Sequence, residues 1–88
     1  MPILFTDEAM EDYLSFSKDS RVILKIGKLI EDIRRNGALK GIGSPEALKY
    51  DYSGLYSREI DSKNRLIYNL LEDGTIQIHS CKGHYNDK

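Results

Sequence analysis

The chain has little of the chemistry on which several large classes of protein depend. Its 88 residues include one cysteine, two prolines and no tryptophan. Because Cys81 alone cannot form an internal disulfide, we expect a reducing, cytoplasmic environment. No apolar run approaches the roughly 20 residues that span a bilayer, and residues 1–13 lack the basic and apolar regions of a signal peptide. No group of cysteines and histidines has the spacing of a zinc site.

A strong charge of one sign is also missing, since the formal net charge is only −1. A nucleic-acid-binding domain is usually basic, so this balance by itself argues against that class. The charges are unevenly distributed, however, because an acidic stretch at residues 1–20 precedes a basic one at residues 21–49. A local basic face could therefore contact phosphate, although many such side chains on helices are simply solvated. The cations of the basic stretch are Arg21, Lys25, Lys28, Arg34, Arg35, Lys40 and Lys49.

What the chain does have is the composition of a small globular protein. Apolar residues make up 40% of the sequence and charged residues 31%. This length and balance fit one folded domain over residues 1–88 and do not fit a disordered tail. A core of this size leaves a modest margin of stability, so a tightly bound partner would extend the lifetime of the protein.

Hydrophobic periodicity predicts two helices after a short strand at residues 3–5. Thr6 is a good N-cap for the first helix, and the acids that follow it suit the positive end of the helix dipole. The second helix is clearer, with Asp19 or Ser20 as its cap and Gly37 as its left-handed end. Its apolar stripe, which we expect to face the core, comprises Val22, Ile23, Ile26, Leu29, Ile30 and Ile33.

The second half of the chain changes to the period of a β-sheet. A glycine-rich loop is expected over residues 36–54, followed by strands at 55–61, 65–71 and 75–82. Glu72, Asp73 and Gly74 carry the signal of a hairpin turn between the last two strands. We therefore predict an α+β fold, in which two N-terminal helices pack on one face of a small, mostly antiparallel four-stranded sheet.

Polar residues of this second half include groups that can cut RNA without a metal. Such cleavage needs a base for the 2′-hydroxyl, an acid for the leaving 5′-oxygen, and cations for the charge that develops on phosphorus. Glu46 is a candidate base, and Lys49, three residues later, could lie in the same cleft. Arg58 and Arg65 are candidate phosphate-binding cations. The alternatives are a surface acid for Glu46 and, for Arg65, an ion pair with Asp61 or Glu59 across a turn.

The end of the chain supplies the remaining candidates. His84 is the candidate acid because histidine exchanges protons near neutral pH, and Tyr85 could stack on a base. The alternative for His84 is an exposed position in a frayed terminus. His79 competes for the same role, but its alternation with isoleucines favours an ordinary side chain on a sheet. Cys81 also lies in a strand pattern, where a buried and inert thiol is expected.

Taken together, these residues and their local sequences are similar to a known family. The chain resembles the YoeB/Txe group of toxins, within the RelE superfamily of bacterial type II toxin–antitoxin systems. The resemblance runs almost from end to end, and its most specific parts are PEALK, NRLIY and the HY near the C-terminus. The remaining matching segments are ILFTDEAMEDYL, KIGKLIEDIRR, GIGSPEALKYDYSG and SREIDSKNRLIY.

This resemblance implies an endoribonuclease that cuts messenger RNA in the ribosomal A site, with no metal or other cofactor. Glu46 would be the general base, His84 the general acid and Arg65 the group that stabilises the transition state. Lys49 would be a supporting cation, and Tyr85 would orient the RNA. The expected products are a 3′ or 2′,3′-cyclic phosphate and a 5′-hydroxyl. The expected partners are the ribosome with its message, a YefM/Axe-type antitoxin, operator DNA through that antitoxin only, and a second copy in a homodimer.

Some positions depart from the family pattern. The family usually has an arginine where this chain has Glu59 and a tryptophan where it has Tyr56, and this chain continues past HY through residues 86–88. These changes leave open a second hypothesis, a non-cleaving binding module of the same fold that blocks the ribosome or another target, as ParE-like relatives bind gyrase. A third hypothesis is a structural partner that holds an antitoxin-like repressor on DNA.

Overall fold

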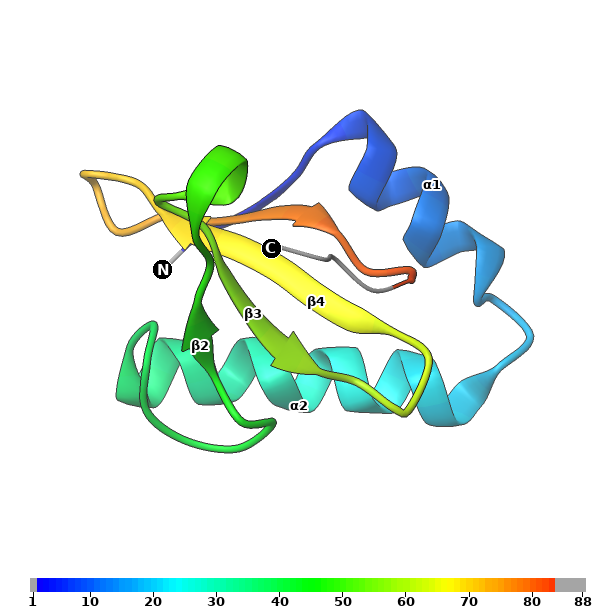
Figure 1. Ribbon diagram of the computed structural model, residues 1–88. Helices are drawn as coiled ribbons and strands as arrows, with labels where there is room; N and C mark the ends of the chain where they lie inside the picture. Colours follow the sequence, from blue (N-terminus) through cyan, green and yellow to red (C-terminus); the bar gives the residue numbers. More distant parts are fainter. Residues whose placement is uncertain (1, 84–88) are drawn as a thin grey trace.

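Five strands form one mixed sheet in the computed structural model, which describes residues 2–83 (Figure 1). The sheet has the order β1-β5-β4-β3-β2. Strands β1 and β5 pair in parallel, and every other neighbouring pair is antiparallel. The strands are β1 (Ile3–Phe5), β2 (Glu46–Ala47), β3 (Tyr56–Glu59), β4 (Arg65–Leu70) and β5 (Ile76–Ser80).

The predicted α+β fold is confirmed, with one strand more than the four expected. Strand β2 lies inside the segment 36–54, which the sequence predicts to be a loop, and pairs with the edge of β3. The same segment contains a short 3₁₀ helix, η1 (Tyr50–Tyr52). Two residues are too few to show the alternation by which a strand is recognised in a sequence. This strand therefore follows from its pairing with β3 and not from a local pattern.

The two predicted helices are present as α1 (Asp7–Ser15) and α2 (Ser20–Asn36). The Thr6 side chain accepts a hydrogen bond from a backbone N–H in the first turn of α1, and the Asp19 side chain does the same for α2. Gly37 ends α2 with a φ of 88°, a conformation that favours glycine. Within residues 2–83, no helix combines the length and apolar character needed to cross a membrane.

Both helices bury side chains in a single core on one face of the sheet. Helix α2 runs along that face, and α1 lies beside β5 and β1 (Figure 1). The predicted stripe of α2 is buried apart from Ile23, which is half-exposed. The strands contribute alternate residues to the same core. The buried cluster includes Ala9, Val22, Ile26, Leu29, Ile30, Ile33, Leu66, Tyr68, Ile76 and Ile78.

The residues that alternate with these core positions point to the opposite side of the sheet, here called the distal face. Cross-strand register places Glu46 beside Ser57, and Ser57 beside Ile67, in one row across β2, β3 and β4. Glu59 and Arg65 form the neighbouring row on β3 and β4. Because side chains alternate along a strand, these five residues share one face. The long side chain of Arg65 reaches across β3 to Glu46 on the edge strand β2.

Candidate functional site

Glu46 and Arg65, the predicted base and the predicted transition-state cation, meet on the distal face. A terminal nitrogen of Arg65 lies 3.5 Å from a carboxylate oxygen of Glu46. Glu46 is on the edge strand with a side chain that is 63% exposed, whereas the Arg65 side chain is only 15% exposed. The two residues are far apart in the sequence, and the sheet register brings them together. The arrangement joins an accessible proton acceptor to a guanidinium that can bind phosphate in two-pronged fashion.

Ser57 is a member of this site that sequence reasoning missed. Its hydroxyl is fully buried and accepts a hydrogen bond from Nε of Arg65 at 3.1 Å. Ser57 is also the cross-strand partner of Glu46. A serine in a strand has no distinctive sequence pattern, so only the pairing of β2, β3 and β4 reveals its position between the two charged residues.

Glu59 lies directly opposite Arg65 in the pairing of β3 with β4. The N–H of Glu59 donates to Gly43 and the N–H of Arg65 donates to Gly83, so the two residues do not exchange backbone hydrogen bonds with each other. Side chains approach more closely in antiparallel pairs of this kind. Glu59 is exposed. Two acids, Glu46 on β2 and Glu59 on β3, therefore lie near Arg65 on the distal face.

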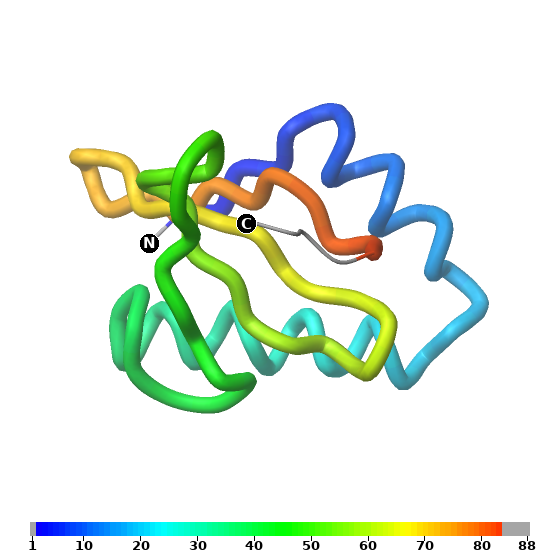
Figure 2. The backbone as a smooth tube through the Cα atoms, in the orientation of Figure 1, coloured from blue at the N-terminus to red at the C-terminus, as the bar shows by residue number. Residues whose placement is uncertain are grey.

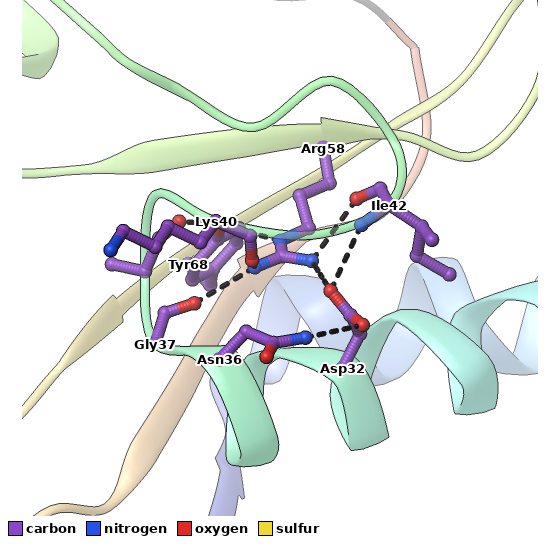
Figure 3. Close-up of polar contacts among 8 residues, drawn as sticks. Asp32, Asn36, Gly37, Lys40, Ile42, Arg58 and Tyr68 are labelled. Carbon is purple, nitrogen blue, oxygen red and sulfur yellow. Dashed lines mark hydrogen bonds and ion pairs between the residues drawn. The ribbon is translucent and has the colours of Figure 1, made fainter.

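Arg58 is not placed to bind RNA, and the prediction of that role is corrected by the structure. Its side chain is fully buried and points toward Asp32 on α2 (Figure 3). The side chains of its neighbours Ser57 and Glu59 lie on the distal face, because side chains alternate along a strand. Nε donates to the Tyr68 hydroxyl at 2.9 Å, and Nη1 forms an ion pair with Asp32. The remaining acceptors are the backbone carbonyls of Gly37, Lys40 and Ile42. A guanidinium enclosed in this way has no surface for a phosphate.

The electrostatics of this buried cluster fit a permanent ion pair. The hydrogen bond from Arg58 holds the pKa of the Asp32 carboxyl below its ordinary value. Burial raises the pKa of the Tyr68 hydroxyl, against the opposing effect of Arg58. The tyrosine hydroxyl therefore keeps its proton and donates it to the carbonyl of Ala38. The ion pair of Arg58 and Asp32 has no net charge, and the hydrogen bonds of the cluster connect α2, the loop after it and the sheet.

Of the other predicted site residues, Lys49 lies within the described region, whereas His84 and Tyr85 lie beyond it. Lys49 is exposed at the start of η1, three residues after Glu46. His84 and Tyr85 lie outside the described residues, and their roles stay predictions. Gly83, the residue before His84, is held beside Arg65, because its carbonyl accepts from the N–H of Arg65 at 3.0 Å. The side chain of Asn64 accepts from the N–H of Gly83 at 2.9 Å.

His79 and Cys81 occupy the positions that the sequence predicts for them, an ordinary side chain on the sheet and a buried thiol. His79 is half-buried on the distal face, where its Nε2 lies 2.8 Å from the side-chain oxygen of Asn69, and burial lowers the pKa of its imidazole. Cys81 is fully buried, and burial raises the pKa of its thiol to about 12. A thiol with this pKa is almost entirely protonated at neutral pH and is a poor nucleophile.

Comparison with known proteins places the whole arrangement in one family. The sequence matches the family described as YoeB-like toxin of bacterial type II toxin-antitoxin system over residues 5–85. Toxin YoeB of Escherichia coli is 38% identical over 86 residues, which are 97% of this chain and 100% of the relative. Toxin YoeB of Streptomyces coelicolor is 42% identical over 86 residues, with the same coverage of 97% and 100%.

Solved structures agree with this assignment. A YoeB dimer from Staphylococcus aureus has a TM-score of 0.89 and 46% identity, covering 97% of this chain and 98% of its own. A heterotetrameric YoeB–YefM toxin–antitoxin complex from the same species has a TM-score of 0.88 and 46% identity, again covering 97% and 98%. A YoeB/ParE toxin from Agrobacterium tumefaciens has a TM-score of 0.91 and 31% identity, covering 97% and 100%. The chain belongs to the YoeB-like toxins of bacterial type II toxin–antitoxin systems, within the RelE/ParE structural superfamily.

Proposed function

We propose that this toxin is a ribosome-dependent endoribonuclease, which cleaves messenger RNA in the ribosomal A site and thereby inhibits translation. The observation that carries the proposal is the approach of Glu46 to Arg65 at 3.5 Å on the distal face. A carboxylate that takes a proton, beside a guanidinium that binds phosphate, meets two of the three requirements of metal-free RNA cleavage. Membership of a toxin family supports a target whose cleavage stops growth.

The first half of the reaction uses the described residues. Glu46 is exposed enough to reach the 2′-hydroxyl of a bound nucleotide and accept its proton. The resulting 2′-oxygen attacks phosphorus, and negative charge grows on the phosphoryl oxygens. Ser57 occupies Nε of Arg65, so the terminal nitrogens of the guanidinium are the groups that meet this charge. An incoming phosphate would also take Arg65 from Glu46 and release the carboxylate to act as a base.

The second half needs an acid. The bond from phosphorus to the 5′-oxygen breaks, and His84 supplies the proton that the leaving oxygen requires. The products are a 2′,3′-cyclic phosphate, which opens to a 3′-phosphate on hydrolysis, and a 5′-hydroxyl. The position of Gly83 beside Arg65 supports this role, because Gly83 is covalently joined to His84. Tyr85 orients the RNA and Lys49 is a supporting cation in the same proposal.

Protein partners belong to the proposal as well. The relatives from Staphylococcus aureus were solved as a YoeB dimer and as a complex with YefM. We extend both states to this chain, as a homodimer and as a complex with a YefM/Axe-type antitoxin, which alone would bring it to operator DNA. A groove of about 500 Å³ along α2, bordered by the exposed side chains of Leu24 and Ile42, supports contact with a protein partner. The cytoplasm, where ribosomes and messenger RNA meet, is the proposed location.

Glu59 favours a second candidate function. An exposed acid directly opposite Arg65 repels the RNA backbone and weakens the binding of phosphate at this position. The fold would then serve as a module that blocks the ribosome without cutting the message. This candidate predicts inhibited translation with intact messenger RNA.

Primer-extension mapping of a defined message on purified ribosomes tests the proposal. Wild type is compared with Glu46→Gln and His84→Ala, and Glu72→Gln is the control because Glu72 is an exposed acid in the turn between β4 and β5. Cuts in the A site are expected with wild type and control, and loss of the base or acid should lower the rate on the order of 10²–10⁴-fold. Blocked translation with an intact message would establish the non-cleaving module instead. Neither cleavage nor inhibition would refute both candidates.

A further inference from the structure

The loop of residues 37–45 delivers Glu46 to the site. It curves round the C-terminal end of α2 before it reaches β2 (Figure 2). Strand β2 pairs with β3 only at Glu46 with Ser57 and at Ala47 with Tyr56. A strand of two residues at the edge of a sheet is not stable by its own pairing. The position of Glu46 therefore depends on the segments on both sides of it. On the C-terminal side, Leu48 is buried and donates its N–H to the carbonyl of Leu55 at 2.9 Å. On the N-terminal side, the position depends on what holds the loop.

Arg58 holds this loop from the buried side of the sheet (Figure 3). Its Nη2 donates to the carbonyls of Gly37 and Lys40 at 2.8 Å and 2.7 Å, and its Nη1 donates to the carbonyl of Ile42 at 3.0 Å. Asp32 on α2 pairs with Arg58 and also accepts the backbone N–H of Ile42 at 3.0 Å. One guanidinium thus ties three points of the loop to the helix.

The backbone of the loop packs closely against this cluster and the helix at two glycines. A Cβ atom added at Gly41 would lie 1.7 Å from a carboxylate oxygen of Asp32, and one added at Gly43 would lie 2.8 Å from Leu29. Both glycines also have positive φ values, of 119° and 82°. The backbone at Gly41 therefore lies against the ion pair itself, so a shift of that pair should displace the loop there.

Strand β3 connects the cluster to the site by alternation. Arg58 points to the buried face and holds the loop. Its neighbour Ser57 points to the distal face and accepts a hydrogen bond from Arg65. The next residue, Glu59, donates its N–H to the carbonyl of Gly43 at 2.7 Å and closes the contact between loop and strand. The same four-residue strand thus positions both members of the Glu46–Arg65 pair.

We propose that Arg58 is a positioning residue for RNA cleavage, which holds the loop of residues 37–45 so that Glu46 meets Arg65. The inference rests on the proposed function, since it gives a part in the reaction to a side chain that RNA does not touch. A displacement of about 1 Å of a reacting group can cost on the order of 10²-fold in rate. The buried guanidinium contributes to rate through geometry and not through its own charge at the phosphate.

A double-mutant cycle with Arg58→Lys and Glu46→Gln tests the inference. Lysine keeps the positive charge, but a single amine cannot reproduce the planar fork that serves the acceptors of Arg58. We expect kcat per folded molecule to fall about 10–100-fold with little change in KM for programmed ribosomes. In the Glu46→Gln background the same change should have almost no further effect, because no carboxylate remains to be misplaced. Circular dichroism supplies the folded fraction for each variant.

Tyr68→Phe provides a milder variant if Arg58→Lys does not fold. It removes only the hydroxyl that accepts from Arg58 at 2.9 Å and donates to Ala38. We expect a smaller loss of kcat, about 3–10-fold, which again disappears in the Glu46→Gln background. Tyr13→Phe is the matched control, because Tyr13 packs against Phe5 on the far side of the core and should leave kcat unchanged.

The outcomes separate the inference from the proposed function. Equal losses of kcat in both backgrounds, or no loss per folded molecule in the single variants, would overturn the positioning role while leaving the nuclease intact. A wild-type protein that does not cut, or a Glu46→Gln protein that cuts as wild type does, would overturn the proposed function and the positioning role with it. Loss confined to the background that retains Glu46 would establish the role.

Discussion

Nε of Arg65 donates a hydrogen bond to the fully buried hydroxyl of Ser57 at 3.1 Å. This contact orients the guanidinium so that its outer nitrogens face Glu46 and the position proposed for phosphate. Neither residue is unusual in the sequence. The hydrogen bond between them fixes the orientation of Arg65, which lies at the start of a strand, so that it can bind negative charge.

Loss of this hydroxyl should impair cleavage more than folding. We expect Ser57→Ala to lower kcat about tenfold, because a guanidinium that has lost this hydrogen bond is less well oriented and stabilises the transition state less well. The free energy of unfolding should fall by only about 1 kcal/mol. Single-turnover cleavage on ribosomes and urea denaturation measure the two effects.

Ser80→Ala is the matched control for Ser57→Ala. Ser80 is also buried in the sheet, but among residues 2–83 its hydroxyl has no hydrogen-bond partner. Its removal should leave kcat unchanged and stability equal or slightly higher. Equal effects of the two substitutions on kcat would show that Ser57 does not orient Arg65.

Reversal of the charge at Glu59 should strengthen the binding of RNA. Glu59→Arg replaces an acid opposite Arg65 with a second cation. We expect the affinity for programmed ribosomes to rise roughly two- to tenfold, the equivalent of about 0.4–1.4 kcal/mol, with a steeper dependence on salt. Glu59→Gln should lie between wild type and Glu59→Arg. Glu72→Arg makes the same charge change in a distant turn, and an equal gain there would mean that net charge alone is responsible.

The buried ion pair predicts a dependence of stability on pH. Arg58 lowers the pKa of Asp32 below its ordinary value of 3.8, so the pair stabilises the fold above about pH 4, and this contribution is lost as the pH falls through the folded-state pKa. Asp32→Asn leaves Arg58 buried without a counter-charge and should cost about 3 kcal/mol at pH 7. The difference from wild type should shrink below pH 4. Urea denaturation from pH 2 to pH 7 measures both.

An exposed pair on the same helix provides the comparison. A carboxylate oxygen of Glu31 lies 3.6 Å from a terminal nitrogen of Arg34, and the two side chains are 59% and 38% exposed. Glu31→Gln should cost about 0–0.5 kcal/mol and should not alter the pH dependence. If Asp32→Asn behaved in the same way, the ion pair of Arg58 and Asp32 would not stabilise the fold.

Cys81 should react only when the protein unfolds. Its thiol is fully buried and has a pKa of about 12. Labelling with a disulfide reagent at pH 8 should therefore follow the rate or extent of unfolding and accelerate with urea. Ser15→Cys places a thiol at an exposed position of α1 and should react at once. Rapid labelling of Cys81 in the native protein would contradict the burial described here.

The helices show how much local pattern can predict. Thr6 and Asp19 cap them as expected, and the stripe of α2 is buried except at Ile23. Caps and stripes depend on residues within one or two turns of each other, so the sequence contains the information directly. The strands β3, β4 and β5 are also where alternation places them, although each is shorter than predicted.

Strand β2 and Arg58 show where local pattern fails. Two residues cannot display a period, so β2 exists only because the edge of β3 is there to pair with it. In the sequence, nothing distinguishes the expected exposure of Arg58 from that of Glu59. Adjacent residues of a strand point to opposite faces, and the packing of α2 decides which face is buried. Arg58, which the sequence predicts to bind RNA, is therefore buried and forms an ion pair with Asp32.

The sequence alone determined the class of fold, the caps and apolar stripe of the helices, and the family resemblance, and it proposed Glu46 and Arg65 as candidates for the site. These depend on short-range periodicity and on residue type. Tertiary structure decided that Glu46 approaches Arg65, that Ser57 orients it, and that Arg58 is enclosed. Strand register and the choice of buried face arise from contacts between distant segments, which a single sequence does not display. The physical division is between local propensity, which is encoded residue by residue, and long-range pairing, which exists only in the folded chain.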